Sequence, residues 1–328
     1  MENSQLVSIV VPAYNAEKTL EASIYSLIEQ SLRKVEIVII NDASDDKTLD
    51  IANLLAKIDS RVKVIDLPFN QGVYKARAVG IEAATGSWIG FMDADDFVKP
   101  TMYERMLKVG EAYSVDIVIC NADRVTQARE FLNHKVSLNK EGVQKKDIFE
   151  SYCHLELGTG ALWNKLYKAS NIKKWGTIKH PIRQDTHEDA VINFGCFYEA
   201  ESIYLLKSSL YEYVYNSASV TSKITNDRAF YKLILSYFLA LFIYKDLDKD
   251  SIILLTDLYR SKLEWSLYQP LSLNLSEQDL QQLTPLMAHG LESSPEAILK
   301  LLLRQPTQKK KLGQLAEKVG REMKIDKI

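Results

Sequence analysis

The sequence predicts an α/β domain, with a mixed, mainly parallel sheet and helices on both faces, followed by an all-helical C-terminal domain. Two observations predict this fold class. Short β-branched runs alternate with helical patterns in the first part of the chain, which is typical of strands joined by crossover helices. From about Asp227 onward, helical patterns follow one another without an intervening strand, so we place a domain boundary near residues 220–227.

The first predicted strands end in turns or polar residues. Because ligands bind at the carboxyl ends of the strands in open α/β sheets, these strand ends are candidate site positions. Strands are predicted at Val7–Val11, Val35–Ile40, Val62–Leu67 and Trp88–Met92, and helices at residues 17–30, from Ser44 or Asp45 to Lys57, and at 73–85.

The strict alternation ends after a helix at 100–113 and a strand at 116–120. We then expect a hairpin or irregular excursion at 123–141, a helix at 145–155, a mobile loop at 175–186, a helix at 190–198, and strands at 203–206 and 210–215. C-terminal helices are predicted at 230–244, 251–268, 277–289, 295–303 and 309–323, with Ser276 and Ser294 as N-caps. The expected domains are residues 1–224, in halves 1–121 and 122–224, and residues 225–328.

Composition limits the class of protein. The 328 residues are 46% hydrophobic and 26% charged, as in soluble globular proteins, and the net charge of −2 gives no reason to expect nucleic acid as a partner. The three cysteines are far apart and lack metal-binding spacing, which fits a reducing cytoplasm. The N-terminus lacks a signal-peptide pattern, and the longest apolar run, Leu233–Tyr244, is too short to span a bilayer. We therefore expect a cytoplasmic protein.

Carboxylates end the fourth predicted strand. The apolar run from Trp88 stops at Asp93, Asp95 and Asp96. A buried strand cannot continue through such charges, because each costs several kcal/mol unless it is paired or bound to a cation. Two carboxylates at an Asp-x-Asp spacing are hard oxygen ligands, suited to Mg²⁺ or Mn²⁺ carrying a diphosphate. The alternative is an acidic turn that caps the next helix.

Together with this acidic end, several other segments resemble family-2 glycosyltransferases, which have the GT-A fold. The resemblance covers residues 7 to about 222 and leaves the helical tail outside. Each motif is short, but their shared order along the chain is specific. The matching segments are Val7–Asn15, Val35–Asp46, Asn70–Gly72 with Ala76, Arg77 and Gly80, Asp93–Asp96, Trp163–Tyr167, and His187–Asp189.

The resemblance implies a UDP-sugar donor and a divalent cation, Mn²⁺ or Mg²⁺. Asp95 is the implied metal ligand, and Asp93 is implied to contact either the ribose or the metal through water. Asp42 is implied to accept the N3–H of uracil, and Arg77 to bridge base and phosphates, since a guanidinium is always charged and forks its donors. The other implied nucleotide-binding residues are Pro12, Ala13, Tyr14, Asn15, Ala94 and, as a weaker candidate, Glu17.

The resemblance also implies a glycan acceptor, either lipid-linked or protein-linked, whose hydroxyl receives a hexose or an N-acetylhexosamine. A carboxylate must take the hydroxyl proton during attack. The resemblance assigns this general base to Asp189, with Glu188 as the alternative, and implies a single in-line displacement with inversion. The implied acceptor-binding residues are Trp163, Asn164, Lys165 and His187.

Two positions depart from the family's pattern. Ala43 replaces a glycine of the second motif, so we expect either that this position needs no positive φ or that the site is reshaped. Many relatives also carry an arginine in the aromatic strand, where this chain has Tyr213-Val-Tyr-Asn216. If that arginine holds the diphosphate, another cation must replace it, or the role is absent.

Structural alternatives exist for the same residues. Asp42 could cap the following helix, Arg77 could be solvated, and Glu188 and Asp189 could be first-turn acids that complement a helix dipole. Two other functions compete with glycosyl transfer. A sugar nucleotidyltransferase would need a Gly-rich basic loop after the first strand, which is absent here. An inactive relative that binds a partner enzyme would have lost Asp95 or Asp189, and both are present.

The C-terminal tail is basic and amphipathic. Leu312, Leu315, Val319 and Met323 fall at helical spacing within residues 305–328. This apolar face could pack on the other helices, join a second subunit, or lie on an anionic membrane. We expect a homo-oligomer formed through these helices, with peripheral contact at the inner face of the membrane as the alternative.

Overall fold

The computed structural model describes residues 6–215, 225–265 and 275–303. The chain divides into two compact units, Met1–Lys179 with Arg183–Ser217, and His180–Ile182 with Ala218–Ile328. The domain limits expected from the sequence remain a prediction.

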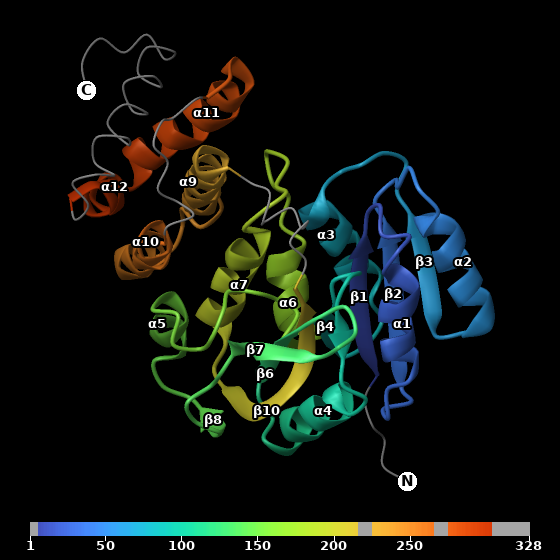
Figure 1. Cartoon of the computed structure of the whole chain (residues 1–328). Coiled ribbons are helices and arrows are strands. Elements are labelled where there is room, and N and C mark those ends of the chain that lie inside the picture. The colour runs from blue at the N-terminus through green and yellow to red at the C-terminus, as the bar shows by residue number, and fades with distance from the viewer. Residues whose placement is uncertain (1–5, 216–224, 266–274, 304–328) are drawn as a thin grey trace. The chain divides into compact units, whose positions relative to one another are not determined.

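The first unit is built on a mixed sheet with the strand order β3-β2-β1-β4-β9-β6-β10-β5 (Figure 1). Its N-terminal strands pair in parallel, as predicted: β1 pairs with β2 and β4, and β2 pairs with β3. The strands are β1 (Val7–Ala13), β2 (Val35–Asn41), β3 (Val62–Asp66) and β4 (Trp88–Phe91), and the helices between them are α1 (Leu20–Ile28), α2 (Thr48–Ile58) and α3 (Val73–Ala83).

Helices cover both faces of this sheet. Consecutive strand residues point to opposite sides, so both faces carry side chains that a helix can cover. Ile37 and Ile39 of β2 belong to a core cluster that includes residues of α1, α2 and a later helix, α4 (Met102–Ala112). Val38 and Ile40 of β2 instead pack with Ala76 of α3. Helix α3 lies so close to β1 that a Cβ on Gly80 would come within 2.3 Å of Val10 Cγ1.

The second half of this unit completes the sheet with mixed pairing. Strand β9 lies antiparallel between β4 and β6, whereas β10 runs parallel to β6. The elements are β5 (Phe97–Val98), α4 (Met102–Ala112), β6 (Ile117–Val125), β7 (Phe131–Val136), β8 (Gly142–Gln144), α5 (Ile148–Cys153), β9 (Lys165–Lys168), α6 (Ala169–Gly176), α7 (Glu188–Glu199) and β10 (Ile203–Val214).

Several element limits differ from the sequence prediction. The hairpin alternative at 123–141 is confirmed, since β6 and β7 pair antiparallel. One strand, β10, replaces the two predicted at 203–215, with register irregularities after Leu206. Helix α2 begins at Thr48, and its first turn is capped by Asp46, which accepts from the Thr48 N–H at 2.9 Å. The prediction that Ser44 or Asp45 is the N-cap of this helix was therefore wrong.

The second unit is helical among its described residues. Its helices are α9 (Asn226–Ile243), α10 (Lys249–Leu263), α11 (Glu277–Ser293) and α12 (Pro295–Leu303). Ser276 forms the predicted N-cap of α11, in a reciprocal capping box with Asp279. The predicted helix at 309–323 lies outside the described residues. None of the helices described by the structure is long and apolar enough to cross a bilayer.

Candidate active site

The turns that follow β1 and β2 are joined by hydrogen bonds. Ser44 Oγ accepts from the Asn15 N–H at 3.0 Å, and Asn15 Oδ1 accepts from the Asp45 N–H at 2.9 Å. Ala43, directly before Ser44, has a φ of 52°, in the left-handed region that favours glycine. The expectation that this position needs no positive φ was wrong. The surrounding bonds hold the alanine there, at a cost of about 1–2 kcal/mol.

The Asp42 carboxylate is hydrogen-bonded to the turn that leads into α3. Its carboxylate accepts from the Gln71 N–H at 2.7 Å and from the Gly72 N–H at 2.9 Å, and the residue is only 3% exposed. The carboxylate thus caps α3 and not the helix that directly follows it in the chain. Each carboxylate oxygen keeps a second lone pair, so a further donor has an acceptor there. The contact of Asp42 with uracil remains a prediction.

Glycine is favoured at position 72 because its φ is +88°, which L side chains rarely adopt. A Cβ there would also lie 2.4 Å from Asp185 Oδ1, so the Asp185 side chain would have to move. Arg183 donates to the Asn70 carbonyl at 3.0 Å and to Asp185 at 2.9 Å. The Tyr74 hydroxyl donates to the Ile178 carbonyl. The segment predicted as a mobile loop therefore begins inside α6 and is bonded to the start of α3.

Arg77, on α3, brings the two halves of the candidate site together. Its guanidinium forms ion pairs with Asp93, at 2.8 Å, and with Glu188, and the residue is 6% exposed. Burial lowers the pKa of Arg77, but attraction by Glu188, Asp93 and Asp189 outweighs it, so the pKa rises. The alternative that Arg77 is a solvated helix residue was wrong.

The three carboxylates after β4 have different environments. Asp96 is 1% exposed and accepts from the Tyr211 hydroxyl at 2.7 Å and the Val214 N–H at 2.8 Å, so it ties the strand end to β10. Burial, then repulsion by Asp93, raises the pKa of Asp95 to about 6. Among the described residues, no cationic side chain forms an ion pair with Asp95.

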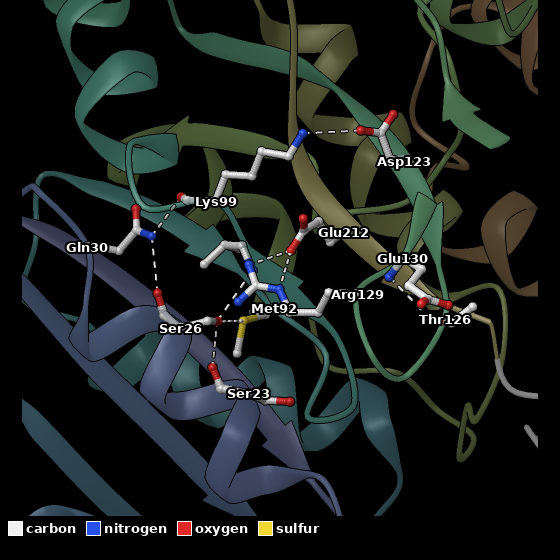
Figure 2. Close-up of polar contacts among 11 residues, drawn as sticks. Ser23, Ser26, Gln30, Met92, Lys99, Asp123, Thr126, Arg129, Glu130 and Glu212 are labelled. Atoms are coloured by element: carbon white, nitrogen blue, oxygen red, sulfur yellow. Dashed lines mark hydrogen bonds and ion pairs between the residues drawn. The ribbon is translucent and has the colours of Figure 1, made fainter. Parts of the chain in front are cut away.

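The backbone behind these carboxylates is fixed by side chains of α1. Figure 2 shows Ser23, Ser26 and Gln30 reaching toward the segment between β4 and α4. Ser23 Oγ donates to the Ala94 carbonyl at 3.0 Å, and Gln30 Nε2 donates to the Lys99 carbonyl at 2.8 Å. These bonds orient the Asp-x-Asp segment before any ligand binds.

Glu188 and Asp189 begin α7, directly after His187, whose φ is 62°. Glu188 is 5% exposed, and its pKa is raised to about 7, by burial first and by Asp189, against the opposing effect of Arg77. Asp189 is half-buried and accepts from the Ala190 N–H at 2.7 Å. Asp189 is thus the more accessible of the two acids, whereas Glu188 is engaged by Arg77.

The other acceptor-side candidates lie mainly inside the protein. Trp163 stacks on Tyr211, with ring centroids 4.4 Å apart. Asn164 and Lys165 are both 0% exposed; Asn164 donates to the Cys120 carbonyl at 2.9 Å, and Lys165 to the Thr159 carbonyl at 3.0 Å. Burial lowers the pKa of Lys165 to about 7. In this structure these two side chains hold the turn that carries Trp163 and do not face solvent.

Tyr211 is a site residue that sequence reasoning missed. Besides donating to Asp96, its hydroxyl accepts from the Asp93 N–H at 3.2 Å. The sequence offered one signal for this role, namely the position of Tyr211 in the aromatic strand with Tyr213 and Tyr215.

The donor set fits a divalent cation that brings its own further ligands. Within the described ranges, His, Cys, Asp and Glu side chains form no group of three or more that could hold a metal by itself. Asp93 and Asp95 supply hard oxygen ligands, and Asp95 carries a charge that its surroundings disfavour. A cation would relieve that penalty, and diphosphate oxygens would complete its coordination.

Comparison with known proteins gives consistent matches. Residues 8–174 match the family described as glycosyl transferase family 2. The sequence is 34% identical over 221 residues to the uncharacterized glycosyltransferase EpsJ of Bacillus subtilis (strain 168), and 31% identical over 227 residues to the uncharacterized glycosyltransferase YibD of Escherichia coli (strain K12). These alignments cover 66% and 67% of this chain, and 63% and 64% of the relatives, so less than two thirds of each relative is spanned.

Solved structures show the same fold. The structure of S. aureus TarS 1-349 in complex with UDP aligns with a TM-score of 0.67 at 20% identity, covering 95% of this chain and 88% of that one. The complex of S. aureus TarS 1-349 with UDP-GlcNAc aligns with a TM-score of 0.66 at 19% identity, covering 89% and 82%.

The buried ion pairs of Arg77 predict a pH-dependent loss of stability in Arg77→Met. Removing one partner of a buried pair costs about 3–5 kcal/mol, because the remaining charge is left uncompensated. Without Arg77, the pKa of Glu188 rises further above its unfolded value, so the stability that its protonation provides is lost as pH rises through that pKa. We therefore expect a larger drop in Tm at pH 8 than at pH 6.

Two further variants sharpen this measurement by thermal unfolding. Glu188→Gln added to Arg77→Met should remove most of the pH dependence. Lys174→Met, which breaks the exposed pair with Glu199, should change stability by less than about 1 kcal/mol. A Tm loss in Arg77→Met that is equal at both pH values would contradict the interpretation.

Proposed function

The chain belongs to glycosyl transferase family 2, and from that premise we propose that it transfers a hexose or N-acetylhexosamine from a UDP-sugar to a hydroxyl of a glycan acceptor, with inversion at the anomeric carbon. One observation carries the proposal. Arg77 joins Asp93, after a central strand, to Glu188, at the start of α7, so the acids of both motifs converge on one buried guanidinium. The TarS structures in complex with UDP and with UDP-GlcNAc support this class of donor.

Asp93 and Asp95 are the residues that we assign to Mn²⁺ or Mg²⁺. When bound, such a cation stabilises negative charge on the leaving diphosphate as a Lewis acid. Arg77 orients Asp93 through its 2.8 Å ion pair. The Asp95 carboxyl gives up its proton when it ligates a metal, which links metal affinity to pH.

The nucleotide would lie against the turns after β1 and β2. Tyr14 is 50% exposed, which leaves its ring free to contact a base, and Pro12 and Ala13 lie beside it in the chain. Asn15 and Glu17 act indirectly in this proposal. Asn15 bonds to Ser44 and Asp45, and Glu17 accepts from the Lys47 N–H at 3.3 Å, so both shape the turn that carries Asp42.

Asp189 is the general base in this proposal. Its carboxylate takes the proton of the acceptor hydroxyl as the hydroxyl oxygen bonds to the anomeric carbon. The bond from that carbon to the diphosphate oxygen breaks, and its electron pair leaves with UDP. Glu188 positions Arg77, Trp163 and His187 contact the acceptor, and the buried Asn164 and Lys165 position the turn that carries Trp163.

The first test of this proposal is the affinity for UDP. We expect UDP to bind more tightly with MnCl₂ than with EDTA at pH 7.5, measured by calorimetry. Because the pKa of Asp95 is about 6, this gain should shrink between pH 7.5 and pH 5.5 as Asp95 becomes protonated. Asp95→Asn should remove the gain at both pH values. Equal affinity with MnCl₂ and EDTA would eliminate the metal from the mechanism.

The second test separates Asp189 from Glu188. Asp189→Asn should lower the rate of UDP release from UDP-GlcNAc and other UDP-sugars by about 10²–10⁴-fold, because general-base catalysis supplies that much. Its affinity for UDP should stay close to that of the wild type, since Asp189 does not contact the nucleotide. Normal turnover in Asp189→Asn would transfer the base role to Glu188.

We also propose that the chain forms a homo-oligomer through its C-terminal helices, with an anionic membrane surface as the competing partner. Multi-angle light scattering of the full chain over a concentration series should give a mass above that of the 37.4 kDa monomer. A monomer mass at every concentration would reject the oligomer and make sedimentation with anionic liposomes the deciding measurement.

A further inference from the structure

Two cations, Arg124 and Lys135, lie over the ring of Tyr213. Arg124 Cζ is 6.0 Å from the ring centroid, and Lys135 Nζ is 4.8 Å from it. Arg124 and Tyr213 are register partners on the parallel strands β6 and β10, so their side chains share one face of the sheet. Lys135 lies at an irregularity in the β6–β7 pairing, between the partners of Ala122 and Asp123. Such irregularities re-aim side chains.

The neighbouring cations of this hairpin have carboxylate partners, whereas these two do not. Figure 2 shows Lys99 paired with Asp123, at 3.2 Å, and Arg129 paired with Glu212, at 2.5 Å. Over the described ranges, Arg124 and Lys135 form no ion pair, and residues 216–224, which follow Tyr215, contain no acid. Arg124 Nε is buried without a hydrogen-bond partner. The two adjacent positive charges thus lie over aromatic rings and form no ion pair with a described carboxylate.

The two cations repel each other. Burial, and then repulsion by Arg124, lowers the pKa of Lys135, while attraction by Asp96 opposes that change. Like charges held together in a half-buried place cost stability unless an anion neutralises them. A guanidinium fork beside an ammonium suits an oxyanion with several acceptor oxygens, such as a phosphoryl group.

Aromatic contacts connect this pair to the candidate active site. The ring centroid of Trp163 is 6.0 Å from that of Tyr213 and 4.4 Å from that of Tyr211. The Tyr211 hydroxyl in turn donates to the Asp96 carboxylate and accepts from the Asp93 N–H. Burial raises the pKa of Tyr213, and Asp96, Asp95 and Asp93 raise it further, so these carboxylates act on the ring beneath the two cations. The cation pair is therefore connected to the Asp-x-Asp segment through the rings of Tyr213, Trp163 and Tyr211. It lies on β6 and β7, whereas the arginine position that this chain lacks is in β10.

We propose that Arg124 and Lys135 together bind a phosphoryl group beside the Asp93–Asp96 carboxylates, in place of the arginine missing from the aromatic strand. The inference rests on the proposed function, because a UDP-sugar brings a diphosphate to those carboxylates. The same chemistry has two sources, namely the diphosphate of the donor and a phosphoryl group of the acceptor. The experiment distinguishes them.

The test measures anion binding by calorimetry in Arg124→Gln, Lys135→Gln and the double variant. The probes are UDP, uridine and inorganic pyrophosphate, each with MgCl₂. If the cations bind the donor diphosphate, the affinities for UDP and for pyrophosphate should fall by about tenfold for each cation removed, and the affinity for uridine should stay unchanged. If they bind a phosphoryl group of the acceptor, the affinity for UDP should stay unchanged, and the UDP-saturated protein should lose its binding of pyrophosphate.

Matched controls exclude a general charge effect. Arg33→Gln and Lys108→Gln remove exposed cations from other parts of the first unit and should leave all affinities unchanged. Lys135→Arg, which keeps the charge, should restore most of the affinity that Lys135→Gln loses.

Two outcomes separate this inference from the proposed function. If the double variant binds UDP and pyrophosphate like the wild type, the cations only pack on Tyr213, and the inference is overturned while the function stands. If the wild type does not bind UDP, the proposed function fails. In that case a selective loss of pyrophosphate affinity in the double variant supports the phosphoryl site, and unchanged affinity overturns it.

Discussion

The ion pairs of Arg77 are the interaction on which the site depends. A guanidinium in the interior is stable only with carboxylates close by, because desolvating an isolated charge costs several kcal/mol. Asp93 and Glu188 meet this need from two separate parts of the first unit's sequence, 16 and 111 positions after Arg77. The parallel half of the sheet delivers Asp93 at a strand end, and α7 delivers Glu188 in its first turn. Attraction by Arg77 also opposes the rise that burial causes in the pKa of Glu188.

Charges without protein partners form a second pattern around the same place. Asp95 is an acid that no described cation pairs with, and Arg124 and Lys135 are cations that no described acid pairs with. A protein selected only for stability would remove such charges or pair them. Their joint presence is understandable if a metal cation and a phosphorylated ligand neutralise them together, since sites for charged ligands are often destabilised when empty.

The sequence predicted the parts of this structure that depend on local pattern. Strand–helix alternation located β1 to β4, and the acids after each strand located Asp42, Asp93 and Asp95, because buried strands exclude charge. Residues whose roles arise from tertiary contacts were predicted less well. Asp42 caps α3 across the sheet edge and not the helix next to it, and Ala43 adopts a positive φ that its neighbours impose. Lys165 was predicted to bind the acceptor, whereas in the structure its ammonium is buried and donates to two backbone carbonyls and the Asn164 side chain.

The bonds between Asp42 and the entrance to α3 have a consequence for how the site moves. Asp42 accepts from the Gly72 N–H, directly before the helix begins, and Arg77 leaves the same helix five residues later, about 7.5 Å further along its axis. A rigid helix keeps that separation constant. A shift of the turn after β2 that moves Gly72 along the helix axis would therefore move Arg77 by the same amount, and it would lengthen or shorten the ion pairs of Arg77 with Asp93 and Glu188. Helix α3 thus couples the position of that turn mechanically to the acids at the strand end and at the start of α7.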